Sequence, residues 1–182
     1  FFYFLAHDPF LLNGVEQFLD APSLRARRIG YPLIAWAVSF GQKSAIPAAL
    51  FLVNLLACLG ATALLARRMV EIKSPQVLAL GFVLSAAVLM AIYVMSCEVV
   101  ALFFLFLAFW AYEHKKSRTL LASSLLAILV KEVCILWLAG LALHALLTRQ
   151  WRTMSIVLLA GVGWLGWGAY VQEQLAEPTG SF

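Results

Sequence analysis

The chain has 182 residues, of which 64% are hydrophobic and only 12% charged, and its net charge is +4. Soluble globular domains are about half apolar and about a quarter charged. Together with a mean hydropathy of +0.93, this composition excludes an ordinary soluble domain and predicts an integral membrane protein. We expect no nucleic-acid partner, because the lysines and arginines flank apolar segments instead of forming a basic stripe.

The first 45 residues are rich in aromatic side chains, but polar residues interrupt them repeatedly. The apolar stretch 31–40 is too short to cross a bilayer. We therefore expect residues 1–45 to form an outer-face interfacial or juxtamembrane region with helices lying near the membrane surface. Residues 1–5 resemble the interior of an element, which predicts that the chain is a piece of a longer protein. A cleaved signal peptide is the alternative.

The first long apolar segment, 46–66, is long enough to cross a hydrocarbon core of about 30 Å. The basic residues Arg67, Arg68 and Lys73 follow it. By the positive-inside rule, this end is expected on the cytoplasmic side. Residues 76–95 are then expected to run outward to a short turn at 96–97, and residues 98–112 to return to a second basic loop.

Residues 119–130 and 133–147 are apolar but short, and basic residues flank the pair. This pattern predicts a hairpin of two short helices whose turn lies at Lys131 and Glu132, below the outer surface. A last span, 154–171, is expected to run outward to a polar tail, 172–182. Glycines in this span would allow a neighbouring helix to approach closely. The predicted fold is all-α, a polytopic transmembrane bundle over 46–171 with N-terminal interfacial helices.

This alternation leaves three arginines, Arg25, Arg27 and Arg28, on the outer side, against the positive-inside trend. If residues 31–41 were half of a re-entrant pair, these arginines would instead be cytoplasmic. We favour the outer placement, because about 11 residues are too few for a span. Three guanidinium groups near lipid need an anion, and a phosphate suits their planar geometry.

A set of charged and polar residues is expected at the outer end of the apolar bundle: His7, Asp8, Arg25, Arg27, Arg28, Glu98, Lys131 and Glu132. Charges within apolar segments are costly unless they are paired or face water, so they mark a candidate site. This layout is typical of a site for a charged headgroup on a lipid tail. A carboxylate there could act as a general base, and an arginine could stabilise a phosphate leaving group.

Structural roles are open for the same residues. Lys131 and Glu132 could form ion pairs or be solvated at the turn. Glu98 could be a first-turn residue of a helix with Ser96 as N-cap. Asp8 could be bonded locally in a turn. The three cysteines have no paired spacing and are interpreted as buried apolar residues. We find no nucleotide or metal motif and expect no cofactor and no metal.

Five stretches carry a resemblance to a known class, namely 6–10, 19–23, 27–33, 53–54 and 129–132. They resemble bacterial multi-spanning membrane glycosyltransferases of the GT-C type. The resemblance implies transfer of a sugar from a polyprenyl-phosphate carrier on the outer face of the inner membrane. The first helix and the acidic motif that usually precede the equivalent of Phe1 are not present here. Val130 stands where relatives often have Thr.

The resemblance implies that Arg27 and Arg28 hold the phosphate and that Asp8, Glu98 or Glu132 bind or activate the acceptor. His7, Arg25, Tyr31 and Lys131 complete the expected substrate-binding set. The expected partners are membrane lipid, a polyprenyl-phosphate-linked sugar and a possible partner membrane protein. Two alternatives are a non-catalytic membrane subunit, and a transporter with Glu98, Lys131 and Glu132 as an ion relay. Against transport, the charges gather at one face and no inverted repeat is visible.

Overall fold

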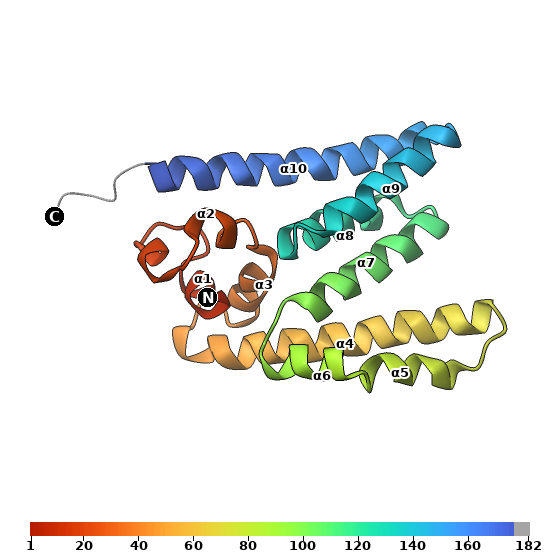
Figure 1. Cartoon of the computed structure of the whole chain (residues 1–182), viewed down its shortest axis with the longest axis horizontal. Helices are drawn as coiled ribbons and strands as arrows, with labels where there is room; N and C mark the ends of the chain where they lie inside the picture. Colours follow the sequence, from red (N-terminus) through yellow and green to blue (C-terminus); the bar gives the residue numbers. More distant parts are fainter. Residues whose placement is uncertain (177–182) are drawn as a thin grey trace.

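The computed structural model describes residues 1–176, which are helical with short connections and contain no β-strand (Figure 1). The predicted all-helical fold is confirmed for these residues. The α-helices are α1 (Phe2–His7), α2 (Pro22–Arg25), α3 (Gly30–Val38), α4 (Ile46–Glu71), α5 (Leu80–Val83), α6 (Ala86–Tyr93), α7 (Glu98–Glu113), α8 (Ser117–Val130), α9 (Cys134–Leu147) and α10 (Trp151–Ala176). Three 3₁₀ turns accompany them: η1 (Val15–Phe18), η2 (Lys43–Ala45) and η3 (Gln76–Ala79).

Two long helices, α4 and α10, lie along opposite sides of the molecule in the view of Figure 1. Each has 26 residues, a length of about 39 Å at 1.5 Å per residue. Both are long and apolar enough to cross a membrane, in agreement with the spans expected at 46–66 and 154–171. Helix α10 includes the start of the expected polar tail, and the rest of that tail, 177–182, lies outside the described residues.

The span expected at 76–95 is not a single straight helix, because the chain there forms η3, α5 and α6 with a bend of 46°. The bend follows from Ser85, whose backbone is extended and whose Oγ accepts a hydrogen bond from the N–H of Val88. A serine in this position starts a new helix and ends the previous one. If the bent pair is one span, up to three segments could cross a membrane.

Helices α7, α8 and α9 are short, with 16, 14 and 14 residues. Their lengths of about 24, 21 and 21 Å are less than a hydrocarbon core. Helices α8 and α9 are joined by residues 131–133, so the predicted turn at Lys131 and Glu132 is confirmed. Figure 1 shows that α7 begins and α8 ends part of the way along α4.

The space left by these short helices is occupied by residues 1–45, between α4 and α10 (Figure 1). We call this the site end of the molecule, where α4 begins and α10 ends. The opposite end, where α4 and α7 end and α10 begins, is called the basic end. Ala6, Tyr31 and Ala35 belong to the same buried core as Ile46 and Leu50 of α4. The N-terminal region therefore packs into the bundle, and its position at an outer membrane face stays a prediction.

One glycine makes this packing possible. A Cβ atom on Gly30, the first residue of α3, would lie 2.7 Å from the backbone nitrogen of Val130 and 2.8 Å from the carbonyl carbon of Leu129. The start of α3 is thereby in direct backbone contact with the end of α8. This contact brings the arginines that precede α3 to the α8–α9 turn.

Candidate functional site

The site is built around an ion pair between Arg28, just before α3, and Glu132, in the α8–α9 turn. The Nε atom of Arg28 donates a hydrogen bond of 2.7 Å to Oε2 of Glu132, and its Nη2 atom donates a second one to Oε1. The side chains are 20% and 27% exposed. A bidentate pair of this kind fixes orientation as well as distance. It connects residues 104 positions apart in the sequence.

Burial is the largest single effect on the pKa of Glu132 and raises it, but the hydrogen bonds from Arg28, a backbone hydrogen bond and the charges of Arg28 and Lys131 together lower this pKa below its usual value of 4.5. Hydrogen bonds to Glu132 likewise outweigh burial at Arg28 and raise the pKa of its guanidinium. Both groups are therefore charged at neutral pH.

A second ion pair lies next to the first. The Nζ atom of Lys131 donates a hydrogen bond of 2.8 Å to Oε1 of Glu98, the first residue of α7. Glu98 is thus a first-turn residue as expected, but Ser96 is not its N-cap; Cys97 is, without a side-chain hydrogen bond. The other oxygen of Glu98, Oε2, is shielded from solvent and has no hydrogen-bond partner among the described residues.

The other two arginines before α3, Arg25 and Arg27, have different surroundings. Arg25 donates hydrogen bonds of 2.9 and 2.8 Å to Asp20, and its guanidinium lies 4.4 Å from the ring centre of Phe1. Asp20 was not among the predicted site residues, because its separation of five residues from Arg25 does not by itself indicate an ion pair. Arg27 has no carboxylate partner among residues 1–176, and its Nε atom is buried without a hydrogen bond.

An apolar groove of about 530 Å³ lies between α3, α8 and α10. We call it the tail groove; its lining includes Ile29, Leu33, Leu125, Leu129, Gly166 and Trp167. A Cβ atom on Gly166 would meet nothing within 4 Å, so this glycine leaves the groove open, whereas Gly163 packs closely against Leu125. The glycines of α10 thus have two effects: Gly163 allows close packing against α8, and Gly166 leaves space for the groove.

Arg27 lies close to α10 and two residues before Ile29, which lines the tail groove. The indole N–H of Trp167 donates a hydrogen bond of 2.9 Å to the carbonyl oxygen of Ala26. The Nε atom of Arg27 is 4.0 Å from the position of a Cβ on Gly168. The segment before α3 is therefore held against α10.

His7 and Asp8 line a separate polar cavity of about 500 Å³ together with Asn13 and Lys43. Asp8 is buried, and its Oδ2 atom accepts a hydrogen bond of 2.6 Å from the backbone N–H of Asn13, as expected for a locally bonded turn residue. Burial, and then the charge of Lys43, lower the pKa of His7. No hydrogen bond or ion pair within residues 1–176 connects His7 or Asp8 to Arg28 and Glu132.

Tyr31 is fully buried between α3 and α4. Its hydroxyl donates a hydrogen bond of 2.9 Å to the carbonyl oxygen of Leu50 and accepts one of 2.7 Å from Nδ2 of Asn54. Its polar atom is thus used inside the protein, and no surface is left for a ligand. We therefore do not retain Tyr31 as a substrate contact, and Asn54, in another of the resemblance stretches, shares its role in the core.

Among the described residues, no group of three or more His, Cys, Asp or Glu side chains could hold a metal ion. Cys58, Cys97 and Cys134 are buried and unpaired, in agreement with their interpretation as small apolar residues. Comparison of the chain with models of known protein families, with curated proteins and with solved structures finds no match. The resemblance to GT-C transferases stays a prediction.

Proposed function

We propose that this chain is part of a multi-pass protein of the bacterial inner membrane that transfers a sugar from a polyprenyl-phosphate carrier to an acceptor on the outer face. The observation that carries the proposal is the position of Arg27, which is two residues before Ile29 and lies close to Gly168 of α10. Ile29 and Trp167, the residue before Gly168, both line the tail groove. A guanidinium suits the phosphate, and an apolar groove suits the polyprenyl chain. In the proposed complex, Arg27 holds the phosphate and the tail groove holds the polyprenyl chain.

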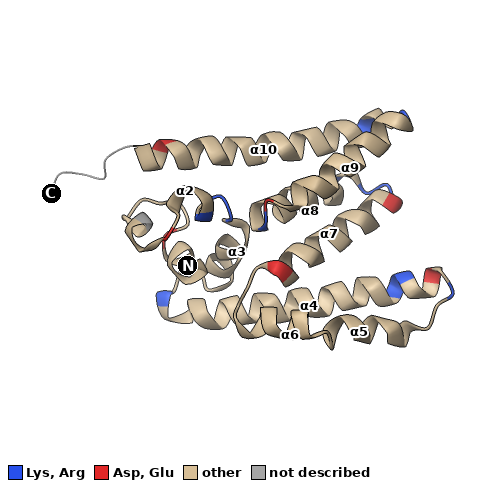
Figure 2. Cartoon of the chain, in the orientation of Figure 1, with Lys and Arg blue, Asp and Glu red and all other residues tan. Residues whose placement is uncertain are grey.

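The distribution of charge supports a membrane orientation. Figure 2 shows lysines and arginines gathered at the basic end, around the ends of α4, α7 and α9 and the start of α10. In the proposed orientation, this end faces the cytoplasm. The bent pair α5–α6 and the short helices α7, α8 and α9 complete the passages between the two faces, and Lys131 and Glu132 lie below the outer surface.

The reaction requires one group for the phosphate and one for the acceptor hydroxyl. In the proposed mechanism, the hydroxyl oxygen attacks the anomeric carbon and its proton passes to Oε2 of Glu98. The bond between that carbon and the phosphate oxygen breaks, and its electron pair leaves with the polyprenyl phosphate, whose charge Arg27 stabilises. Contacts support this division of roles. Glu98 pairs with Lys131. The residue after Lys131, Glu132, pairs with Arg28, which follows Arg27 in the sequence.

The test is native mass spectrometry of the protein in detergent with a polyprenyl-phosphate sugar, combined with an assay of sugar transfer. We expect Arg27→Ala to weaken binding about 10- to 100-fold, the effect of losing a hydrogen bond to a charged group. Arg118→Ala, an exposed arginine near the start of α8 at the basic end, is the matched control. Unchanged binding and transfer in Arg27→Ala would disprove the assignment.

One observation favours a second candidate, a non-catalytic membrane subunit. Arg25, Arg28 and Lys131 all have carboxylate partners within the chain, as expected for ion pairs that serve structure. This alternative predicts stoichiometric purification with another membrane protein. It also predicts that Glu98→Gln and Glu132→Gln leave the activity of that complex unchanged, whereas the transferase proposal predicts its loss in Glu98→Gln.

A further inference from the structure

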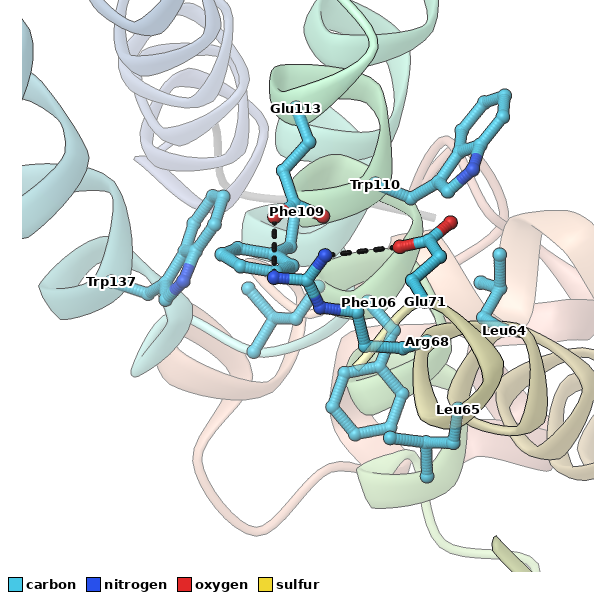
Figure 3. A pocket seen from close by; sticks show the side chains of 10 residues that line it. Leu64, Leu65, Arg68, Glu71, Phe106, Phe109, Trp110, Glu113 and Trp137 are labelled. Carbon is cyan, nitrogen blue, oxygen red and sulfur yellow. Dashed lines mark hydrogen bonds and ion pairs between the residues drawn. The ribbon is translucent and has the colours of Figure 1, made fainter. Parts of the chain in front are cut away.

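Another cavity, of about 350 Å³, lies at the basic end between α4, α7 and α9 (Figure 3). Most of its lining is apolar, from Leu64, Leu65, Leu105, Phe106, Phe109 and Trp137. Arg68, Glu71 and Glu113 add charged groups. None of these residues belongs to the site described above, which is at the opposite end of the molecule.

The charged residues form a compact cluster of both signs. Arg68 lies between two carboxylates, 2.8 Å from Oε1 of Glu113 and 3.0 Å from Oε2 of Glu71 (Figure 3). Arg67 is not part of the lining, but its side chain is 60% exposed, lies 3.8 Å from Glu71 and lies over the ring of Trp110, and both of these residues line the cavity. Two cations and two carboxylates have no net charge, so the cluster complements a ligand that carries both a positive and a negative group.

Groups on both sides of this cluster remain available. Glu113 uses Oε1 for Arg68, and nothing in the described part of the chain donates a hydrogen bond to its Oε2. The guanidinium of Arg67 has a single, longer ion pair and is largely exposed. The cluster therefore offers a carboxylate oxygen to an ammonium group and a guanidinium to a phosphate.

The apolar part of the cavity lies on the bilayer side of these charges. Residues 46–66 of α4 cover about 30 Å, so Arg67 and Arg68 fall at the level of the lipid headgroups in the proposed orientation. Leu64 and Leu65 precede Arg68 by one turn of α4. Leu105 and Phe106 precede Glu113 by about two turns of α7. The cavity thus extends from the headgroup level toward the hydrocarbon.

We propose that this cavity binds a membrane phospholipid whose headgroup carries a primary ammonium and a phosphate. The ammonium is held by Glu113, the phosphate by Arg67, and an acyl chain lies along Leu64, Leu65 and Phe106. A headgroup with only a negative charge would leave Oε2 of Glu113 without an ammonium partner. The inference rests on the membrane orientation given under Proposed function, but it is independent of sugar transfer.

The test is native mass spectrometry of the purified protein with phosphatidylethanolamine, phosphatidylcholine and phosphatidylglycerol of identical acyl chains. We expect phosphatidylethanolamine to bind about 10-fold more tightly than the other two, the effect of one hydrogen bond between charged groups. Glu113→Gln should abolish this preference. Leu65→Trp should fill the cavity and lower the binding of all three lipids. Glu173→Gln, an exposed carboxylate at the site end, is the matched control.

Equal binding of the three lipids, or a preference that survives in Glu113→Gln, would overturn the proposal. Circular dichroism and the melting temperature of each variant establish that it is folded. The isosteric Glu113→Gln leaves Arg68 paired with Glu71, which preserves the α4 side of the cluster. Binding of polyprenyl phosphate should be unchanged in Glu113→Gln, so failure of this proposal and failure of the transferase proposal are distinguishable.

Discussion

Glu132 is held in its charged form by Arg28, and this has a consequence for stability. Its pKa is below 4.5 in the folded protein, because the hydrogen bonds and charge of Arg28, together with a backbone hydrogen bond and the charge of Lys131, outweigh the effect of burial, which is the largest single effect. A lowered pKa means that the pair stabilises the folded state above the unfolded-state value, and that this contribution is lost as the pH falls through the folded-state value. The pair is therefore at full strength at neutral pH and fails only in acid.

We expect Glu132→Gln to lower the free energy of unfolding by about 1–3 kcal/mol at pH 7, because Arg28 loses a charged hydrogen-bond partner. Its melting temperature in detergent should also fall less steeply than that of the wild type as the pH is lowered below about 4.5. Thermal unfolding followed by tryptophan fluorescence measures both effects. Glu173→Gln should leave the stability at pH 7 unchanged. An unaltered acid dependence in Glu132→Gln would contradict the assignment.

Residue type alone did not distinguish site residues from core residues. Tyr31 was expected to bind substrate, yet its hydroxyl is bonded to Leu50 and Asn54 in the core. Asp8 was expected to be catalytic or locally bonded, and its contact with Asn13 is the local one. A buried polar group needs a hydrogen-bond partner, and that partner is a property of the folded chain.

At the scale of elements, the close approach of α3 to α8 decides where Arg28 and Glu132 meet. At Gly30 the two backbones come so near that a Cβ would lie within 2.8 Å of backbone atoms of 129–130. Backbone atoms cannot move aside as a flexible side chain does. The position of Arg28 beside Glu132 depends on this contact.

We expect Gly30→Ala to destabilise the protein by about 1–3 kcal/mol through overpacking. Gly161→Ala is the matched control, because a Cβ there meets nothing within 4 Å. It should instead stabilise α10 by about 0.5–1 kcal/mol through helix propensity. Melting temperatures of the two variants in detergent should therefore shift in opposite directions. A neutral Gly30→Ala would show that α3 and α8 are less closely packed.

The bent pair α5–α6 illustrates the limit of hydropathy at this scale. Residues 76–95 are apolar throughout, which predicts one continuous helix. Ser85 instead caps α6, and the two parts differ in direction by 46°. A single N-cap hydrogen bond in an apolar run changes the path of the chain without changing its mean hydropathy.

For the whole molecule, the arrangement of helices puts two sets of exposed residues at opposite ends. Lys43 and Glu173 lie at the site end, and Lys73 and Lys115 lie at the basic end. The three native cysteines are buried. Single cysteines introduced at these four positions would therefore report on which side of a membrane each end lies.

We expect Lys43→Cys and Glu173→Cys to react with a membrane-impermeant maleimide in intact cells. Lys73→Cys and Lys115→Cys should react only in inside-out vesicles, because basic loops are retained on the cytoplasmic side. The chain without a substitution serves as the control and should remain unlabelled. Labelling of all four positions from the same side would refute the proposed orientation.

The sequence by itself determined the helical class, the two long apolar segments and the turn at Lys131 and Glu132. These features follow from hydropathy and from the cost of placing charges within apolar runs, both of which are local properties. Only the tertiary structure decided which charges pair, that Tyr31 belongs to the core, and that Arg27 lies close to α10. Such facts depend on contacts between residues far apart in the chain, and Arg28 and Glu132, 104 positions apart, are the clearest case.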